Sequence, residues 1–219
     1  MITYSNNSDS VIIVLHEIYG INQHMKLVCE NYNRAGFDVI CPDLFYLIEP
    51  FDYSDEEKAY QYFIKNVGFN LAAEQIRKLI AEVKPKYKHV LLLGFSIGAT
   101  LAWLCSDGDI GCDGIIGYYG SRIRDYLYIN PKCRTLLIFP NKEKSFSVGD
   151  LLCTLKKKAN VDAHMLNGNH GFCDPFSSNY NDEAFVVAEK LISKQIRQIR
   201  TQIRDGSSKE SVCEEKKLL

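Results

Sequence analysis

Residues 89–105 read HVLLLGFSIGATLAWLC and contain the strongest local signal in the chain. The first five residues form an apolar run typical of a buried strand, and the segment from residue 99 is typical of a buried helix. The turn between them reads Gly94-Phe95-Ser96-Ile97-Gly98, a serine between two glycines. Such a turn is tight, because a Cβ at either glycine would collide with a neighbouring element. The pattern predicts a nucleophile elbow that presents Ser96, and the alternative is an ordinary glycine-rich turn.

The same alternation of apolar runs and amphipathic stretches extends along the chain in both directions. Strands are predicted over 11–16, 37–41, 89–94, 114–119, 134–139 and 161–166. Helices are predicted over 22–35, 54–83 (with a break near Gly68), 97–105, 147–158 and 182–204. Most of the strand runs are continuously apolar, which is typical of strands covered on both faces. The sequence therefore predicts an α/β fold, a three-layer α/β/α sandwich around a mostly parallel sheet.

The composition indicates one globular domain. Of 219 residues, 46% are hydrophobic and 24% are charged, which excludes wholesale disorder and a fibrous repeat. We expect a single domain over residues 1–204 and a disordered, charged tail over residues 205–219. The isoleucines at helical spacing in 182–204 are expected to dock on the domain, although a membrane-surface or partner helix would show the same pattern.

Charge and patterning also restrict partners and location. The 26 Lys and Arg residues balance 27 Asp and Glu residues, so no basic field points to nucleic acid or to an anionic membrane. The longest apolar runs are too short to cross a bilayer, and residues 1–10 lack the order of a signal peptide. We expect a cytoplasmic monomer or dimer. Its eight cysteines, which form no Cys-x-x-Cys pair, should be reduced thiols.

A serine nucleophile needs a base, and His170 is the best candidate among five histidines. It lies in a polar, glycine-rich loop, 167–172, directly after the last predicted strand. Such loops lie at the carboxyl edge of a parallel sheet, where ligands bind. The alternatives are a loop histidine bonded to the backbone, or a zinc ligand together with His164 and Cys173, for which the spacing is poor.

The third member of a triad should be an acid that follows the strand before the histidine. Glu143 is the first carboxylate after the predicted strand 134–139, and it could hold the tautomer of His170. Asp150, on the following predicted helix, and Asp125, after the preceding strand, are the competing candidates.

Two further groups are expected around the site. Glu17 and Ile18 directly follow the first apolar strand, so a carboxylate and free backbone N–H groups should lie at the same edge. The N–H groups of Ile18 and Ile97 are the expected oxyanion donors. Aromatic residues could line an acyl pocket or belong to the core, and the candidates for a substrate pocket are Phe45, Tyr119 and Phe172.

Over residues 11–190 the chain resembles the dienelactone hydrolase family of α/β-hydrolases. The resemblance rests on five motifs in order: VLHEIYG (14–20), CPDLF (41–45), GFSIG (94–98), GYYG (117–120) and HGF (170–172). It implies the α/β-hydrolase fold of the small dienelactone hydrolase type. It also implies that Ser96 stands where the family usually has a cysteine nucleophile. The family base would then be His170, the family aspartate Glu143, and the family glutamate beside the resting nucleophile Glu17.

The chain departs from the family pattern where the substrate carboxylate would bind. The resemblance implies two arginines, one four residues after the catalytic histidine and one near the start of the helix after residue 54. Here the first position is Asp174 and the second region reads Glu56-Glu57-Lys58. An anionic lactone would meet repulsion at these carboxylates. We therefore expect a substrate other than a dienelactone.

Together these features predict a hydrolase that cleaves small carboxylic ester, lactone or thioester bonds through a Ser-His-acid triad and an acyl-enzyme, without metal or organic cofactor. A non-catalytic binding or scaffold protein on the same fold and a small serine peptidase are the alternatives.

Overall fold

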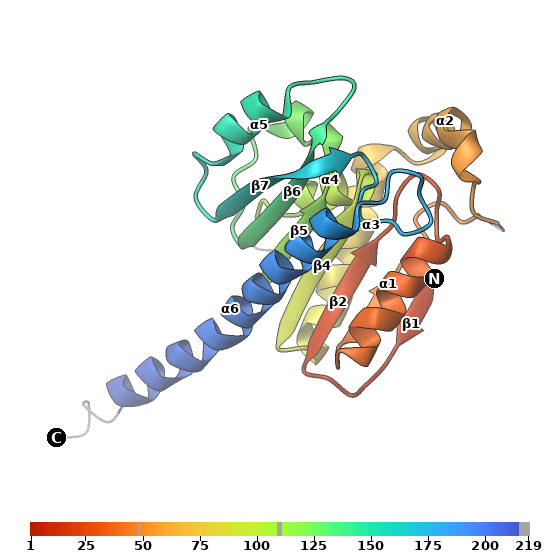
Figure 1. Cartoon of the computed structure of the whole chain (residues 1–219). Helices are drawn as coiled ribbons and strands as arrows, with labels where there is room; N and C mark the ends of the chain where they lie inside the picture. The colour runs from red at the N-terminus through yellow and green to blue at the C-terminus, as the bar shows by residue number, and fades with distance from the viewer. Residues whose placement is uncertain (48, 109–110, 215–219) are drawn as a thin grey trace.

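The computed structural model describes residues 1–47, 49–108 and 111–214, and side chains up to residue 201. One seven-stranded sheet forms its centre, in the order β1-β3-β2-β4-β5-β6-β7 (Figure 1). All neighbouring strands are parallel except β1, which pairs antiparallel with β3. The strands are β1 (Ile2–Tyr4), β2 (Ser10–Leu15), β3 (Asp38–Cys41), β4 (His89–Phe95), β5 (Gly114–Tyr118), β6 (Arg134–Lys142) and β7 (Val161–Asn169).

Helices cover both faces of this sheet. They are α1 (Gln23–Arg34), α2 (Glu56–Asn66), α3 (Gly68–Val83), α4 (Ile97–Leu104), α5 (Val148–Leu155) and α6 (Asp182–Glu214), with short 3₁₀ turns η1 (Tyr53–Asp55), η2 (Lys84–Lys86) and η3 (Ser121–Tyr126). Alternate residues of β2 point to opposite faces. Ile12 and Val14 pack with α1 and α6, whereas Val11 and Ile13 pack with α2, α3, α4 and α5. This arrangement confirms the predicted three-layer sandwich.

Burial explains which strands the sequence could predict. Every residue of β2, β4 and β5 is buried, in agreement with their continuous apolar runs. The edge strand β7 instead alternates, with exposed positions between covered ones. The prediction missed β1, because a three-residue edge strand with half-exposed side chains is too short to show a period.

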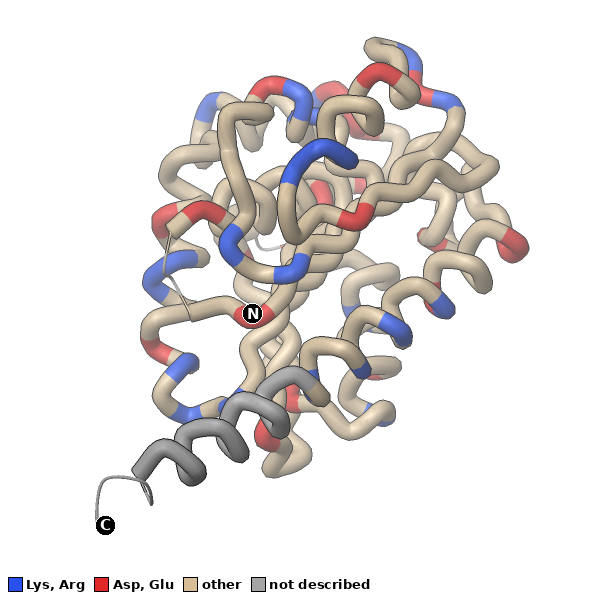
Figure 2. The backbone as a smooth tube through the Cα atoms, turned by 90° about the vertical axis from the view of Figure 1, so that its left-hand side faces the viewer, with Lys and Arg blue, Asp and Glu red and all other residues tan. Residues whose placement is uncertain are grey.

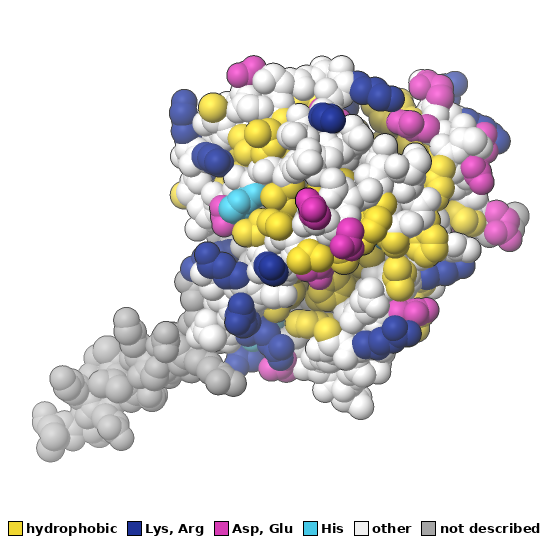
Figure 3. Space-filling model, in the orientation of Figure 1, with side chains coloured by type: hydrophobic (Ala, Val, Ile, Leu, Met, Phe, Trp, Pro, Cys, Tyr) yellow, Lys and Arg dark blue, Asp and Glu magenta, His cyan; other side chains and the backbone are white. Residues whose placement is uncertain are grey.

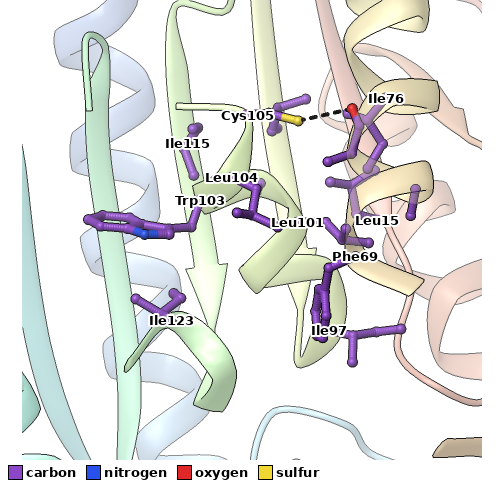
Figure 4. Close-up of a cluster of buried hydrophobic side chains, with 14 of the residues drawn as sticks. Leu15, Phe69, Ile76, Ile97, Leu101, Trp103, Leu104, Cys105, Ile115 and Ile123 are labelled. Atoms are coloured by element: carbon purple, nitrogen blue, oxygen red, sulfur yellow. Dashed lines mark hydrogen bonds between the residues drawn. The ribbon is translucent and has the colours of Figure 1, made fainter. Parts of the chain in front are cut away.

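The core on the α4 side is built around a helix that is buried on all sides. All eight residues of α4 are buried, because it lies between the sheet and α3 and beside η3 (Figure 4). Its Trp103 uses the one polar atom of its ring to donate a hydrogen bond to the carbonyl of Tyr126, at 3.0 Å. This burial on every side explains why 97–104 carries no charged residue.

The last helix is longer than predicted. Its isoleucines Ile192, Ile196 and Ile199 are buried against the sheet, as the docking prediction required. Acidic residues lie in its first turn, where they suit the helix dipole, and basic residues follow along its described length (Figure 2). The helix runs to Glu214, ten residues beyond the predicted end at 204. Residues 215–219 and the side chains from 202 lie outside the described part, so a disordered tail stays a prediction.

Two glycines allow the backbone at the start of α4 to pack closely against β4 and β2. A Cβ on Gly94 would lie 2.6 Å from the nitrogen of Ala99, and one on Gly98 would lie 2.6 Å from the carbonyl carbon of Leu15. Between them, Ser96 has a positive φ of 52°, a conformation that L-residues rarely adopt. The elbow is therefore held against β2 by contact between two backbones.

We predict that Gly98→Ala destabilises the protein by about 3 kcal/mol or more, because the new methyl group would overlap the backbone of β2. Gly149→Ala is the matched control. It lies in the exposed part of α5, where a Cβ would meet only the hydroxyl of Ser147 at 3.8 Å. That change should raise stability by roughly 0.5–1 kcal/mol through helix propensity. Urea unfolding measures both free energies, and equal effects would contradict the steric explanation.

Candidate active site

Three predicted residues meet at the carboxyl edge of the sheet. The Oγ of Ser96 lies 2.9 Å from Nε2 of His170, and Nδ1 of His170 lies 2.8 Å from Oε1 of Glu143. Each residue directly follows a strand: Ser96 follows β4, Glu143 follows β6 and His170 follows β7. Parallel strands end at the same edge, so side chains 74 and 27 positions apart can touch.

The structure distinguishes the three candidate acids. Glu143 contacts the imidazole, and its side chain is only 7% exposed. Asp150 is instead exposed on α5, where its backbone N–H donates the N-cap hydrogen bond to Oγ of Ser147. Asp125 forms an ion pair with Arg122, with 3.2 Å between Nε and Oδ2. The carboxylate that can orient His170 is therefore Glu143.

The same contacts set the protonation of the histidine. Burial by itself lowers the pKa of His170, but the hydrogen bond and the charge of Glu143, with smaller contributions from Glu17 and Glu56, outweigh it and raise that pKa above 6.5. A carboxylate at Nδ1 favours the tautomer with its proton on that atom. Nε2 is then free to accept the proton of Ser96.

The expected oxyanion donors lie beside the serine. Ile97 is the first residue of α4, so its N–H belongs to the first turn, whose N–H groups have no acceptor within the helix. Ile18 follows the end of β2, and both isoleucines line the cavity that contains Ser96 and His170. The close contact between Gly98 and β2 brings these two backbone segments together.

Glu17 lies beneath the site and is only 4% exposed. It accepts a hydrogen bond from the hydroxyl of Tyr119 at 2.8 Å, and Nδ1 of His24 lies 3.6 Å from it. Burial by itself raises the pKa of Glu17, but the His24 ring and the Tyr119 hydroxyl outweigh it and lower that pKa. Within the described residues, the hydroxyl that bonds Glu17 is that of Tyr119 rather than that of Ser96.

The predicted substrate-pocket residues need correction. Phe45, Tyr119 and Phe172 are all buried in the core. Phe45 packs edge-on against His16 and beside Phe63. The hydroxyl of Tyr119 points to Glu17. The centroids of its ring and the ring of His170 lie 4.8 Å apart, so the tyrosine ring packs against the histidine. Aromatic residues that follow a strand can point into the core or into a cleft, and the sequence does not separate the two.

The cavity around the triad has a volume of about 560 Å³ and charged walls. Exposed Glu56 and buried Asp174 occupy the region where the resemblance implies arginines, and the hydroxyl of Tyr53 donates to Asp174. On another wall, η3 supplies Arg122 and Arg124, which sequence reasoning missed. Their position in the segment after β5 was the available signal, because Ser96, Glu143 and His170 also follow strands.

A larger, mostly apolar hollow of about 790 Å³ lies between α1 and α6 (Figure 3). The rings of Phe95 and Tyr118 form part of its wall, whereas the triad lines the smaller cavity. The chemistry of the side chains, rather than the size of the hollow, locates the candidate active site.

Two of the residues considered as zinc ligands, His164 and Cys173, contact other side chains. Nε2 of His164 lies 2.8 Å from Oδ1 of Asp162, and the thiol of Cys173 lies 3.1 Å from the hydroxyl of Tyr119. Among the described side chains, in residues 1–47, 49–108 and 111–201, no group of three or more His, Cys, Asp or Glu could hold a metal ion. Among the described helices, none has both the length and the apolar character required to cross a membrane.

Comparison with known proteins finds similar sequences and similar solved structures. The uncharacterized protein YczH of Bacillus subtilis is 37% identical over 184 residues, 83% of this chain and 90% of that protein. Carboxymethylenebutenolidase 1 of Cupriavidus pinatubonensis is 24% identical over 201 residues, 84% of each chain. A solved dienelactone hydrolase-like promiscuous phosphotriesterase from metagenomic libraries has a TM-score of 0.69 at 15% identity, covering 87% of this chain and 86% of its own.

A second solved structure, Est1E from Butyrivibrio proteoclasticus, has a TM-score of 0.62 at 12% identity, covering 89% of this chain and 90% of its own. At these identities the structures establish the shared α/β-hydrolase fold. The family model for the dienelactone hydrolase family matches residues 1–199, almost the whole described chain. With that match, and with the motifs of the elbow and the histidine loop in place, the chain belongs to the dienelactone hydrolase family.

Proposed function

We propose that this member of a hydrolase family is a serine hydrolase that cleaves small carboxylic ester, lactone or thioester bonds. The observation that carries the proposal is the unbroken line of hydrogen bonds from Ser96 through His170 to Glu143. The name of one relative, carboxymethylenebutenolidase, supports an acyl substrate. The intact line also favours an enzyme over a non-catalytic scaffold.

The reaction follows from the geometry. Ser96 Oγ attacks the carbonyl carbon while Nε2 of His170 takes its proton, and Glu143 stabilises the imidazolium that forms. The N–H groups of Ile97 and Ile18 hold the oxyanion of the tetrahedral intermediate. His170 then returns the proton to the leaving group, and an acyl-enzyme on Ser96 remains. Water, activated by the same imidazole, releases the acid.

Glu17 has a positioning role in this scheme. A serine keeps its proton until the base removes it during attack, so the mechanism requires no second carboxylate to ionise the nucleophile. Glu17 instead fixes Tyr119, whose ring packs on His170, and its charge adds to the raised pKa of that histidine. Glu17 thus positions His170 through the ring of Tyr119.

We predict that Ser96→Ala lowers kcat for a small aryl ester such as p-nitrophenyl acetate by about 10⁴–10⁶-fold, the scale of triad knockouts. Ser193→Ala, on the exposed side of α6, is the control and should keep the wild-type rate. A fluorophosphonate probe should label the wild type and the control but leave Ser96→Ala unlabelled. Wild-type turnover by a folded Ser96→Ala protein would refute the proposed nucleophile.

We predict an acid limb in the pH profile of kcat/KM, because only neutral His170 can act as a base. Since Glu143 raises the pKa of His170, the midpoint should lie above 6.5, and Glu143→Gln should move it to lower pH. The same change should lower the plateau by about 10⁴-fold through loss of the tautomer. Asp150→Asn should alter neither quantity. A Glu143→Gln midpoint at or above the wild-type value would contradict the assignment of the acid.

A further inference from the structure

Two thiols meet at the end of the sheet opposite the active site. The Sγ atoms of Cys112 and Cys133 lie 3.3 Å apart. Cys112 precedes β5 and Cys133 precedes β6, and these strands are parallel neighbours with Gly114 paired to Arg134 (Figure 1). The two cysteines therefore face each other because of the strand register, and the ladder holds them there.

This pair differs from the other cysteines in the described residues. Cys29, Cys41, Cys105 and Cys173 are buried, and Cys153 is exposed. Cys112 and Cys133 are only partly buried, and both line a polar cavity of about 610 Å³ at the amino edge. A reactant the size of hydrogen peroxide can therefore reach sulfur atoms that already touch.

The pair shares its protons unevenly. The hydrogen bond from Cys112, which outweighs the effect of burial, lowers the pKa of Cys133. The same bond and burial raise the pKa of Cys112. These shifts favour Cys133 as the sulfur that ionises first, with the Cys112 thiol in contact as its partner. Asp113, whose charge acts on both thiols, is held by Lys84 and by the N–H of Val90, each at 2.7 Å, which reduces its repulsion of a thiolate.

We propose that Cys112 and Cys133 are an oxidisable dithiol, a modification site at which hydrogen peroxide closes an intramolecular disulfide. The Cys133 thiolate attacks one peroxide oxygen, the O–O bond breaks, and the products are Cys133 sulfenic acid and hydroxide. Cys112 then attacks the sulfenic sulfur, and the S–S bond forms as water leaves with the Cys112 proton. Each cysteine loses one electron and the peroxide gains two.

Forming the disulfide needs only a small movement of the two sulfur atoms, and its effect on stability can be measured. A disulfide S–S bond is about 2.05 Å long, so the sulfur atoms need to approach by little more than 1 Å from 3.3 Å. The bond would tie the segment 112–133, which includes β5 and the loop carrying η3. Constraining that loop in the unfolded chain should raise Tm by on the order of 5–10 °C.

The test compares the purified full chain before and after hydrogen peroxide, using non-reducing mass spectrometry and peptide mapping. The wild type should lose about 2 Da in a cross-linked peptide pair that contains Cys112 and Cys133, and dithiothreitol should reverse the loss. Cys153→Ser, which removes the exposed thiol, should behave like the wild type at this pair.

The two single variants identify the order of steps. Cys112→Ser should stop at a Cys133 sulfenic acid that dimedone traps, whereas Cys133→Ser should give little dimedone adduct at Cys112. Neither variant should show the Tm increase after oxidation. The proposal is overturned if both thiols of the treated wild type remain fully alkylatable, or if the two single variants trap dimedone equally. These measurements do not involve turnover, so they are independent of the proposed hydrolase.

Discussion

The contact between the start of α4 and the end of β2 is the constraint on which the site depends. Gly98 lies against the carbonyl groups of Leu15 and His16 so closely that a side chain atom cannot fit. This approach forces the backbone of Ser96 into a positive φ and turns its hydroxyl out of the sheet. It also brings the first N–H of α4 beside the loop at Ile18. One steric contact thus positions the proposed nucleophile and both expected oxyanion donors.

Near that contact lies a layer of buried polar side chains, and burying such groups costs free energy unless they are hydrogen-bonded. Glu17 and Asp174 are both buried, and Nδ1 of His24 lies 3.6 Å from a carboxylate oxygen of each. Hydroxyl groups complete the set, since Tyr119 donates to Glu17 and Tyr53 donates to Asp174. The layer keeps negative charge under His170 without exposing it to water. This arrangement fits a base whose conjugate acid must be stabilised.

The two edges of the sheet carry different chemistry. At the carboxyl edge, loops after β4, β6 and β7 present a hydroxyl, a carboxylate and an imidazole within hydrogen-bonding distance. At the amino edge, the segments before β5 and β6 present two thiols in contact. The parallel register accounts for both, because it aligns the ends of neighbouring strands. In this protein, the reactive groups therefore lie on the segments that enter and leave the strands.

The sequence by itself determined the architecture and named the candidate residues of the site. Continuous apolar runs in β2 and β4 required cover on both faces, and the glycines around Ser96 required a close turn. Local patterns show which residues can react, but they contain no distances across the sheet. Only the tertiary structure chose Glu143 over Asp150, turned Tyr119 into the core, placed Arg122 and Arg124 at the cavity, and brought Cys112 to Cys133. Each of these depends on strand order and side-chain direction, which are set by packing between segments far apart in the chain.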